Sequence, residues 1–267
     1  MRIIKKSKEI NSLFNSIRRT GFVPTMGSLH KGHESLIKKS IKQNNITFVS
    51  IFINPKQFTN KNDLINYPRR LNDDIKICKK LKVDYLFLPS FKEVYSWKMK
   101  MKKYPKIKSI MEHKYRKGHF NGVLKVIEKL SDIIPANKMY LGEKDFQQLK
   151  IIEDYFHLNK INTKIIKCKI IRDKNGLALS SRNKLLAKKD LLKAARIINF
   201  IKKNILKKKP LNDKIKIVKK YLKDSKINFD YVKNINIKNF EIEKKKTKYS
   251  RFFIAFYIKN IRLIDNI

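Results

Sequence analysis

The chain has 267 residues and carries 65 Lys and Arg against 22 Asp and Glu, which gives a formal net charge of +43. Hydrophobic residues make up 42% of the sequence, so a disordered polyelectrolyte is excluded, because disorder requires low hydrophobicity as well as charge. Only two cysteines are present, too few for a disulfide framework. The longest mainly apolar stretch covers residues 48–53, far short of the ~20 residues that a membrane span needs. No apolar segment follows the basic start as a signal peptide would require, so we expect a cytoplasmic protein with no membrane partner.

The strong positive charge comes mostly from lysine. Only 11 of the 65 basic residues are Arg, and the lysines are spread along the whole chain. Nucleic-acid-binding proteins usually cluster their basic residues, often with Arg for bidentate contacts. We interpret the charge as drift in an AT-rich coding sequence, since Lys, Ile and Asn have AT-rich codons, and we expect no specific nucleic-acid partner. Non-specific attraction to polyanions would remain.

Strands and helices are predicted to alternate along the first part of the chain. Apolar runs that favour buried strands cover residues 21–26, 46–54, 84–89, 138–141 and 162–172. Helical spacing of apolar residues covers 28–44, 70–81, 122–134 and 145–158. This alternation predicts βαβ units and a doubly wound parallel α/β sheet.

The pattern changes after about residue 177. Helices are predicted at 182–209 and 213–222, followed by strands at 228–235, 249–259 and 262–265. Helices followed by strands favour a smaller α+β domain. We therefore expect two domains, 1–175 and 176–267.

The first motif that carries chemistry is PTMGSLHKGH at residues 24–33. A strand ends, Gly27 permits a tight turn, and a helix begins with His30 and His33 on one face of its first turn. A helix N-terminus attracts anions, and two imidazoles there could donate protons or hydrogen bonds to a departing pyrophosphate. The alternatives are two ordinary, partly buried histidines, or a zinc site, for which no third ligand has suitable spacing.

The second motif is FINPKQF at residues 52–58, where the second strand should end. In open α/β sheets the ligand crevice lies beyond the carboxyl ends of the strands. Asn54 and Gln57 carry neutral amides suited to substrate hydroxyl and carboxylate oxygens. A turn directed by Pro55, with incidental amides, is the alternative.

Two further motifs also stand where a strand gives way to a helix. In GEKDFQQ, at residues 142–148, Lys144 could neutralise a phosphate, and Asp145 could accept ribose hydroxyls or merely cap the helix. In GLALSSRN, at residues 176–183, two hydroxyls and the guanidinium of Arg182 could form a second anion clamp.

Taken together, these blocks resemble the pantoate–β-alanine ligase (pantothenate synthetase) family of the HxGH nucleotidyltransferase superfamily. The resembling blocks are PTMGSLHKGH, INPKQF, YPR at 67–69, GHF at 118–120, LGEKDFQQL, DKNGLALSSRN at 173–183 and RLIDN at 262–266. They occur in the family's order and span essentially the whole chain, although residues 184–259 match only in layout.

The resemblance implies ATP-dependent condensation of pantoate with β-alanine, through a pantoyl adenylate, to give pantothenate, AMP and pyrophosphate. It implies a Rossmann-like nucleotide- and pantoate-binding domain, a smaller C-terminal lid domain and a homodimer. The implied catalytic residues are His33, His30 and Lys144. The implied ATP-binding residues are Met26, His30, His33, Gly142, Lys144, Asp145, Ile171, Ser180, Ser181 and Arg182. The implied pantoate-binding residues are Gln57 and Gln148, to which the second motif adds Asn54.

No protein metal ligand is assigned. Asp73 and Asp74 match a carboxylate pair sometimes placed near metal, but Ile77 stands where a further ligand would be expected. We expect Mg²⁺ to be carried with ATP, which is a substrate here, and held by phosphate oxygens and water. Arg116 matches a pocket position whose orientation the sequence leaves open.

Two rival functions remain at this stage. One is a polyanion-binding protein that keeps an inactive nucleotide fold, whose binding would depend steeply on salt. The other is a different HxGH adenylyltransferase acting on a phosphorylated acceptor. The neutral pair Gln57 and Gln148 argues against the second, since a phosphorylated acceptor would favour Arg or Lys.

Overall fold

The computed structural model describes residues 1–14, 19–96 and 102–267. The chain divides into two compact units. The first contains Met1–Ile107 and Arg116–Ile170, and the second contains Lys108–Tyr115 and Ile171–Ile267. The sequence predicts a single division after residue 175, whereas the chain changes unit after Ile170 and also contributes the short 108–115 segment to the second unit.

The first unit is built on a six-stranded sheet in the order β1-β4-β3-β2-β5-β6, and every neighbouring pair is parallel. The strands are β1 (Arg2–Ile4), β2 (Thr20–Thr25), β3 (Ile46–Ile51), β4 (Tyr85–Phe87), β5 (Lys138–Gly142) and β6 (Lys164–Cys168). The predicted parallel sheet is confirmed. Strand β1 is not predicted from the sequence, because it is only three residues long.

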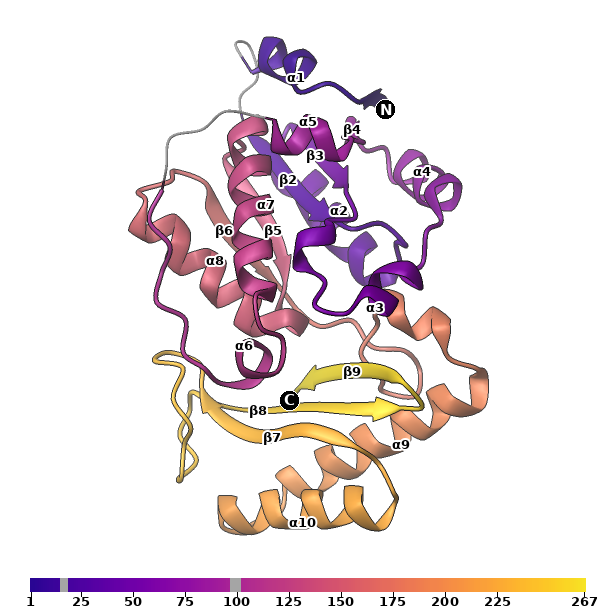
Figure 1. The fold of residues 1–267 in the computed structure, drawn as a ribbon, viewed down its shortest axis with the longest axis vertical. Helices are drawn as coiled ribbons and strands as arrows, with labels where there is room; N and C mark the ends of the chain where they lie inside the picture. The colour runs from indigo at the N-terminus through magenta and orange to yellow at the C-terminus, as the bar shows by residue number, and fades with distance from the viewer. Residues whose placement is uncertain (15–18, 97–101) are drawn as a thin grey trace. The chain divides into compact units, whose positions relative to one another are not determined.

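Helices cover both faces of this sheet (Figure 1). Phe22 and Phe48 lie in a core with Leu124 and Ile152, which belong to α7 and α8. Their strand neighbours Val23 and Val49 lie in a second core with Ile37 of α2 and Cys78 of α4. Successive side chains of a strand point to opposite faces, so the two cores show that the sheet is doubly wound. The helices of this unit are α1 (Ser7–Leu13), α2 (Lys31–Gln43), α3 (Lys61–Ile65), α4 (Leu71–Lys80), α5 (Phe91–Tyr95), α7 (His119–Ile133) and α8 (Phe146–Leu158), with 3₁₀ turns η1 (Pro55–Gln57) and η2 (Glu143–Asp145).

Strand β2 lies at the topological switch point of the sheet. From β2 the chain proceeds to β3 and β4 on one side, and it later adds β5 and β6 on the other. Phe22 pairs with Phe48 of β3 and with Met139 of β5. In open α/β sheets ligands bind beyond the strand carboxyl ends at this point, so the segments that follow β2, β3 and β5 are the ones to examine.

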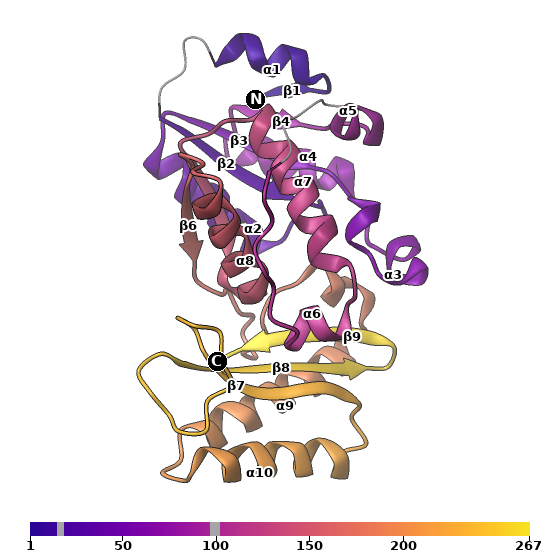
Figure 2. The same ribbon diagram turned by 60° about the vertical axis from the view of Figure 1, so that its left-hand side comes forward.

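The second unit is an antiparallel sheet of β7 (Phe229–Asn236), β8 (Ser250–Ile258) and β9 (Ile261–Asn266). Helices α9 (Lys188–Ile205) and α10 (Leu211–Asp224) pack on one face of it (Figure 2). The short α6 (Met111–Tyr115) is attached through Glu112, whose carboxylate forms a two-point ion pair with Arg262 at 2.7 and 2.8 Å. The predicted smaller α+β architecture is confirmed.

The predicted helix over 182–209 is wrong at both ends. Residues Ser181–Leu185 form the 3₁₀ turn η3, and Leu186 and Ala187 have extended backbone before α9 begins at Lys188. The Ser180 hydroxyl accepts a hydrogen bond from the Arg182 N–H at 3.3 Å. This local capping competes with helix formation, and the Lys-rich composition alone cannot indicate it.

No helix in the described part of the chain is long and apolar enough to cross a membrane. Both cysteines, Cys78 and Cys168, are free and buried.

The buried thiols are expected to resist thiol reagents in the native protein. Burial, with a contribution from the Asp74 carboxylate, raises the pKa of Cys78 to about 12, and burial also raises the pKa of Cys168. Since the thiolate is the reactive form, Ellman's reagent at pH 8 should detect no thiol before denaturation and both thiols after it. Rapid labelling of either cysteine in the native protein would contradict this expectation.

Candidate active site

The loop from β2 to α2 carries the HxGH motif and turns sharply. Gly27 and Ser28 both have left-handed backbone, with φ values of 77° and 51°. Asp74 of α4 accepts hydrogen bonds from the backbone N–H groups of Ser28 and Leu29, both at 2.7 Å. These two N–H groups, which could otherwise bind an anion from outside, are thus directed at a carboxylate of the protein.

His30 and His33 lie together at the start of α2. The His30 ring is the N-cap of the helix, and its Nδ1 accepts a hydrogen bond from the Gly32 N–H at 3.1 Å. A neutral imidazole that accepts at Nδ1 carries its proton on Nε2, so His30 can donate a hydrogen bond from Nε2. The ring centroids of His30 and His33 are 4.1 Å apart, and both side chains are partly exposed. The predicted pairing of the two histidines on one face is confirmed.

The segment after β3 forms an internal amide network. Asn54 is fully buried, and its Oδ1 accepts from the Tyr95 hydroxyl at 2.8 Å and from the Lys56 N–H at 3.2 Å. Its Nδ2 donates to Gln57 Oε1 and to the Gly122 carbonyl, both at 3.1 Å. In this structure both polar atoms of Asn54 make hydrogen bonds inside the protein, and the substrate contact expected of Asn54 stays a prediction. Asn54 therefore positions Gln57.

Gln57 is oriented by this network toward the HxGH loop. Its Oε1 accepts from Asn54, and its Nε2 contacts the Met26 sulfur at 2.7 Å. Burial raises the pKa of Tyr95 to about 12, and the hydrogen bond to Asn54 lowers it by a smaller amount. Tyr95 is therefore a neutral hydrogen-bond donor near pH 7. The structure thus brings the segments after β2 and β3 together at Gln57 and Met26.

Gly122 allows the segment after β3 to approach α7 closely. A Cβ atom at this position would collide with the backbone carbonyl group of Lys56, so no other residue fits there without a shift of the backbone. His119, also in α7, accepts from Arg116 at Nε2 (3.0 Å) and donates from Nδ1 to the Gln57 carbonyl (2.6 Å). The orientation of Arg116, which the sequence left open, is thus toward His119, and both residues hold the backbone of Gln57.

The segment after β5 supplies a cation and a carboxylate. The Lys144 ammonium lies 3.7 Å from an Asp145 carboxylate oxygen, and the Lys144 side chain is 17% exposed. Asp145 is the N-cap of α8, but its side chain makes no capping hydrogen bond. The capping role that the sequence left open for Asp145 is therefore not used. Gly142 ends β5 with open space where a Cβ atom would lie, and Gln148 is partly exposed in the first turn of α8.

The remaining predicted residues belong to the second unit. The Ile171 carbonyl accepts from the Leu179 N–H at 3.0 Å, which closes a loop around Gly176. This loop leads to Ser180, Ser181 and Arg182 at the start of η3. Arg172, at the start of this loop, forms a two-point ion pair with Asp265 at 2.6 and 2.9 Å. The geometry of this loop within the unit is thus set by Arg172 and Asp265, to which the sequence assigned no role.

Asp73 and Asp74 lie side by side in the first turn of α4 but have different surroundings. Asp74 directs both oxygens at backbone N–H groups. The Asp73 side chain is 56% exposed and lies 3.7 Å from Arg70. Among the described residues no group of three or more His, Cys, Asp or Glu side chains is arranged to hold a metal ion.

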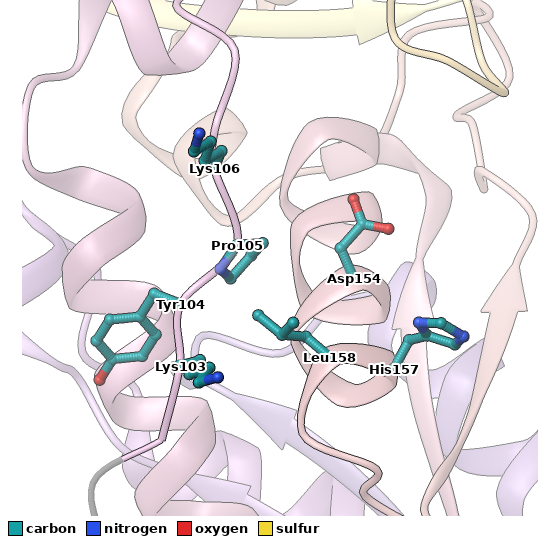
Figure 3. A pocket seen from close by; sticks show the side chains of 7 residues that line it. All are labelled: Lys103, Tyr104, Pro105, Lys106, Asp154, His157 and Leu158. Atoms are coloured by element: carbon teal, nitrogen blue, oxygen red, sulfur yellow. The ribbon is translucent and has the colours of Figure 1, made fainter.

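A separate open cavity of about 690 Å³ lies between residues 103–106 and α8 (Figure 3). Its lining residues are Lys103, Tyr104, Pro105, Lys106, Asp154, His157 and Leu158. None of these is a predicted site residue, and Asp154 is paired with Lys150 at 2.5 Å. The chemistry suggested by the motifs lies at the strand ends and not in this cavity.

The parallel sheet, with a histidine pair at its switch point, defines a Rossmann-like α/β protein of the nucleotide-binding class. The family model for pantoate-beta-alanine ligase matches residues 2–267. A pantothenate synthetase of Azobacteroides pseudotrichonymphae is 42% identical over 279 residues, covering 100% of this chain and 99% of the relative. The chain therefore belongs to the pantoate–β-alanine ligase family.

Solved structures agree with this assignment. Pantothenate synthetase from Thermus thermophilus superposes with a TM-score of 0.91 at 27% identity, covering 100% of this chain and 99% of that one. Pantoate-beta-alanine ligase from Francisella tularensis, complexed with beta-gamma ATP and beta-alanine, superposes with a TM-score of 0.82 at 40% identity, covering 100% and 97%. The resemblance that the sequence blocks indicate is confirmed.

Proposed function

We propose that this chain condenses pantoate with β-alanine, using ATP and releasing AMP and pyrophosphate, through a pantoyl-adenylate intermediate. Family membership supports the ligase activity, and the ligands of the Francisella tularensis structure support ATP and β-alanine as substrates. The observation that carries the proposal is the contact of Gln57 with Met26. This contact places a neutral amide beside the segment that follows β2, which suits an acceptor without a phosphate group better than a phosphorylated one.

In the first step a pantoate carboxylate oxygen attacks the α-phosphorus of ATP, and the bond to pyrophosphate breaks. Gln57 and Gln148 hold pantoate, and Lys144 stabilises the charge that grows on the α-phosphate oxygens. His30 donates from Nε2 to the phosphates, and His33 is the proton donor to the departing pyrophosphate. The proposed ATP contacts are Met26, His30, His33, Gly142, Lys144, Asp145, Ile171, Ser180, Ser181 and Arg182.

In the second step the amine of β-alanine attacks the acyl carbon of the adenylate. The bond to AMP breaks, and the amine loses a proton as the amide forms. Adenylation supplies the good leaving group that a free carboxylate lacks, so no covalent enzyme nucleophile is needed. The main task of the protein is to position the reactants and neutralise their charge.

Mg²⁺ is proposed to enter with ATP, where it would neutralise phosphate charge. Phosphate oxygens and water would hold it, because the carboxylate of Asp74 beside the HxGH loop is already engaged. The family resemblance further supports a cytoplasmic homodimer in which the first unit is the nucleotide- and pantoate-binding domain and the second unit is a lid domain.

The direct test is to incubate the purified chain with ATP, Mg²⁺, pantoate and β-alanine and to look for pantothenate and AMP by mass spectrometry. Omitting each substrate in turn provides the controls. If no pantothenate forms, and the chain instead transfers AMP to an added phosphorylated acceptor, the chain is a different HxGH adenylyltransferase.

The net charge of +43 makes polyanion binding the second candidate function. The dependence of activity and of binding on salt concentration distinguishes it from the ligase function. Binding through many phosphate contacts weakens about 10³–10⁵-fold between 50 and 200 mM salt. We expect turnover to persist at about 200 mM salt while any DNA binding is lost. Salt-resistant, sequence-specific DNA binding with no turnover would favour the second candidate.

A further inference from the structure

The loop that presents the two histidines has an unfavourable backbone that requires support. Gly27 and Ser28 follow one another in left-handed conformation, and Ser28 has a side chain that disfavours it. Ser28 is fully buried, so water cannot satisfy its backbone N–H. This conformation persists only if the surrounding structure holds it.

Asp74 supplies that support from a distant part of the chain. One carboxylate oxygen accepts from the Ser28 N–H and the other from the Leu29 N–H, each at 2.7 Å. Successive backbone N–H groups in such a turn form a concave anion-binding nest. Asp74 is 1% exposed and lies in the first turn of α4, where the helix dipole favours a negative charge.

The loop and the carboxylate fit closely. A Cβ atom at Gly27 would lie 2.9 Å from Asp74 Oδ2 and 2.9 Å from the Ile51 side chain. The peptide planes of residues 27–29 are therefore fixed immediately before His30, whose ring caps α2. The backbone from which the His30 ring extends is thereby held in place, while the ring itself is fixed by its hydrogen bond from the Gly32 N–H.

We propose that Asp74 is a positioning residue for His30 and His33 and that its carboxylate is not a ligand of Mg²⁺. Both of its oxygens serve the loop, Asp73 faces solvent beside Arg70, and Ile77 offers no ligand atom. The catalytic part of this inference rests on the proposed ligase function; the structural part does not.

The test compares Asp74→Asn with the matched control Asp73→Asn, which removes the same charge one residue away. Asparagine keeps one acceptor but turns an amide NH₂ toward a backbone N–H. We expect Asp74→Asn to lower the unfolding temperature of the ligand-free protein in EDTA by about 4 °C or more. We expect Asp73→Asn, which loses only a surface pair and a helix-dipole interaction, to lower it by less than about 2 °C. In Asp74→Asn the ¹⁵N spectrum of His30 should also lose its wild-type pattern.

Kinetics give the second readout. Asp74→Asn should lower kcat about ten- to a hundredfold, as a misplaced reacting group does, with no change in the Mg²⁺ concentration for half-maximal rate. If Asp74 were a metal ligand, Asp74→Asn would instead raise the Mg²⁺ concentration needed for half-maximal rate. If both variants raise the required Mg²⁺ and leave the EDTA unfolding temperature and the His30 spectrum unchanged, the proposal is overturned.

A rescue variant addresses the case in which Asp74→Asn does not fold. Glycine adopts left-handed backbone readily, so Ser28→Gly should restore part of the stability and rate that Asp74→Asn loses. The double variant is measured against Ser28→Gly alone. Failure of any rescue, with Ser28→Gly itself stable, would contradict loop positioning. Because unfolding and the His30 spectrum need no substrate, they test the inference even if the chain makes no pantothenate.

Discussion

Replacing His33 with alanine is expected to lower the rate of adenylate formation by about 10²–10⁴-fold, the usual contribution of a general acid. His33 lies in the first turn of α2 beside His30, with its side chain partly exposed. Its loss removes no helix cap, so the fold should be retained. Single-turnover formation of AMP or adenylate measures the rate, and thermal unfolding checks the fold.

Lys31→Ala is the matched control, because Lys31 is exposed in the same helical turn and its loss changes the local charge without touching either imidazole. It should retain nearly full activity. His30→Ala is less informative, since it also removes the N-cap acceptor of Gly32, a loss of about 1 kcal/mol in stability. Full activity of His33→Ala would show that His33 is not the proton donor.

Local sequence patterns predicted most of the fold because its elements carry their own periodicity. The buried strands β2, β3 and β5 and the amphipathic helices α2, α4 and α8 occur close to their predicted ranges. The missed elements are short, such as β1, α3 and α6. Such segments are too short to show a period, and their formation depends on tertiary contacts.

The parts of the site that sequence could not predict depend on contacts between distant residues. The carboxylate of Asp74 meets the backbone of Ser28 across 46 positions, and His119 meets Gln57 across 62. Spacing along the chain carries no information about such pairs. Asn54 shows the same limit: its residue type suggested a substrate contact, but not the four hydrogen bonds through which the buried side chain also holds Gln57.

The few arginines of this lysine-rich chain supply a related signal. Arg172 and Arg262 each form a two-point pair with one carboxylate, Asp265 and Glu112 respectively. A lysine ammonium cannot reproduce a planar fork. If drift replaces Arg with Lys wherever charge alone matters, the arginines that remain mark positions where geometry matters. The eleven arginines also include exposed ones such as Arg2, so their scarcity gives a short list that contains Arg172 and Arg262 but does not single them out.

In the presence of pantoate and the absence of β-alanine, the chain is expected to exchange labelled pyrophosphate into ATP. Adenylation is reversible and requires only ATP and the pantoate carboxylate, so the amine has no part in it. Omitting pantoate should stop the exchange, because no carboxylate remains to attack the α-phosphorus. Exchange is measured as label in ATP separated from pyrophosphate. Exchange that needs β-alanine, or that proceeds without pantoate, would contradict an acyl-adenylate mechanism.

Variants of the exchange assay separate the roles of Lys144 and the glutamines. Lys144→Ala should slow exchange about 10²–10³-fold at saturating substrates, as loss of a group that stabilises transition-state charge does. Gln57→Ala or Gln148→Ala should instead raise the pantoate concentration required, since each removes a hydrogen bond of about 1.5–3 kcal/mol to a charged group. Lys150→Ala, which breaks only the surface pair with Asp154, is the control and should exchange normally. If Lys144→Ala changed only the pantoate requirement, Lys144 would be a substrate-binding residue, and the charge on the α-phosphate would have to be stabilised by other groups.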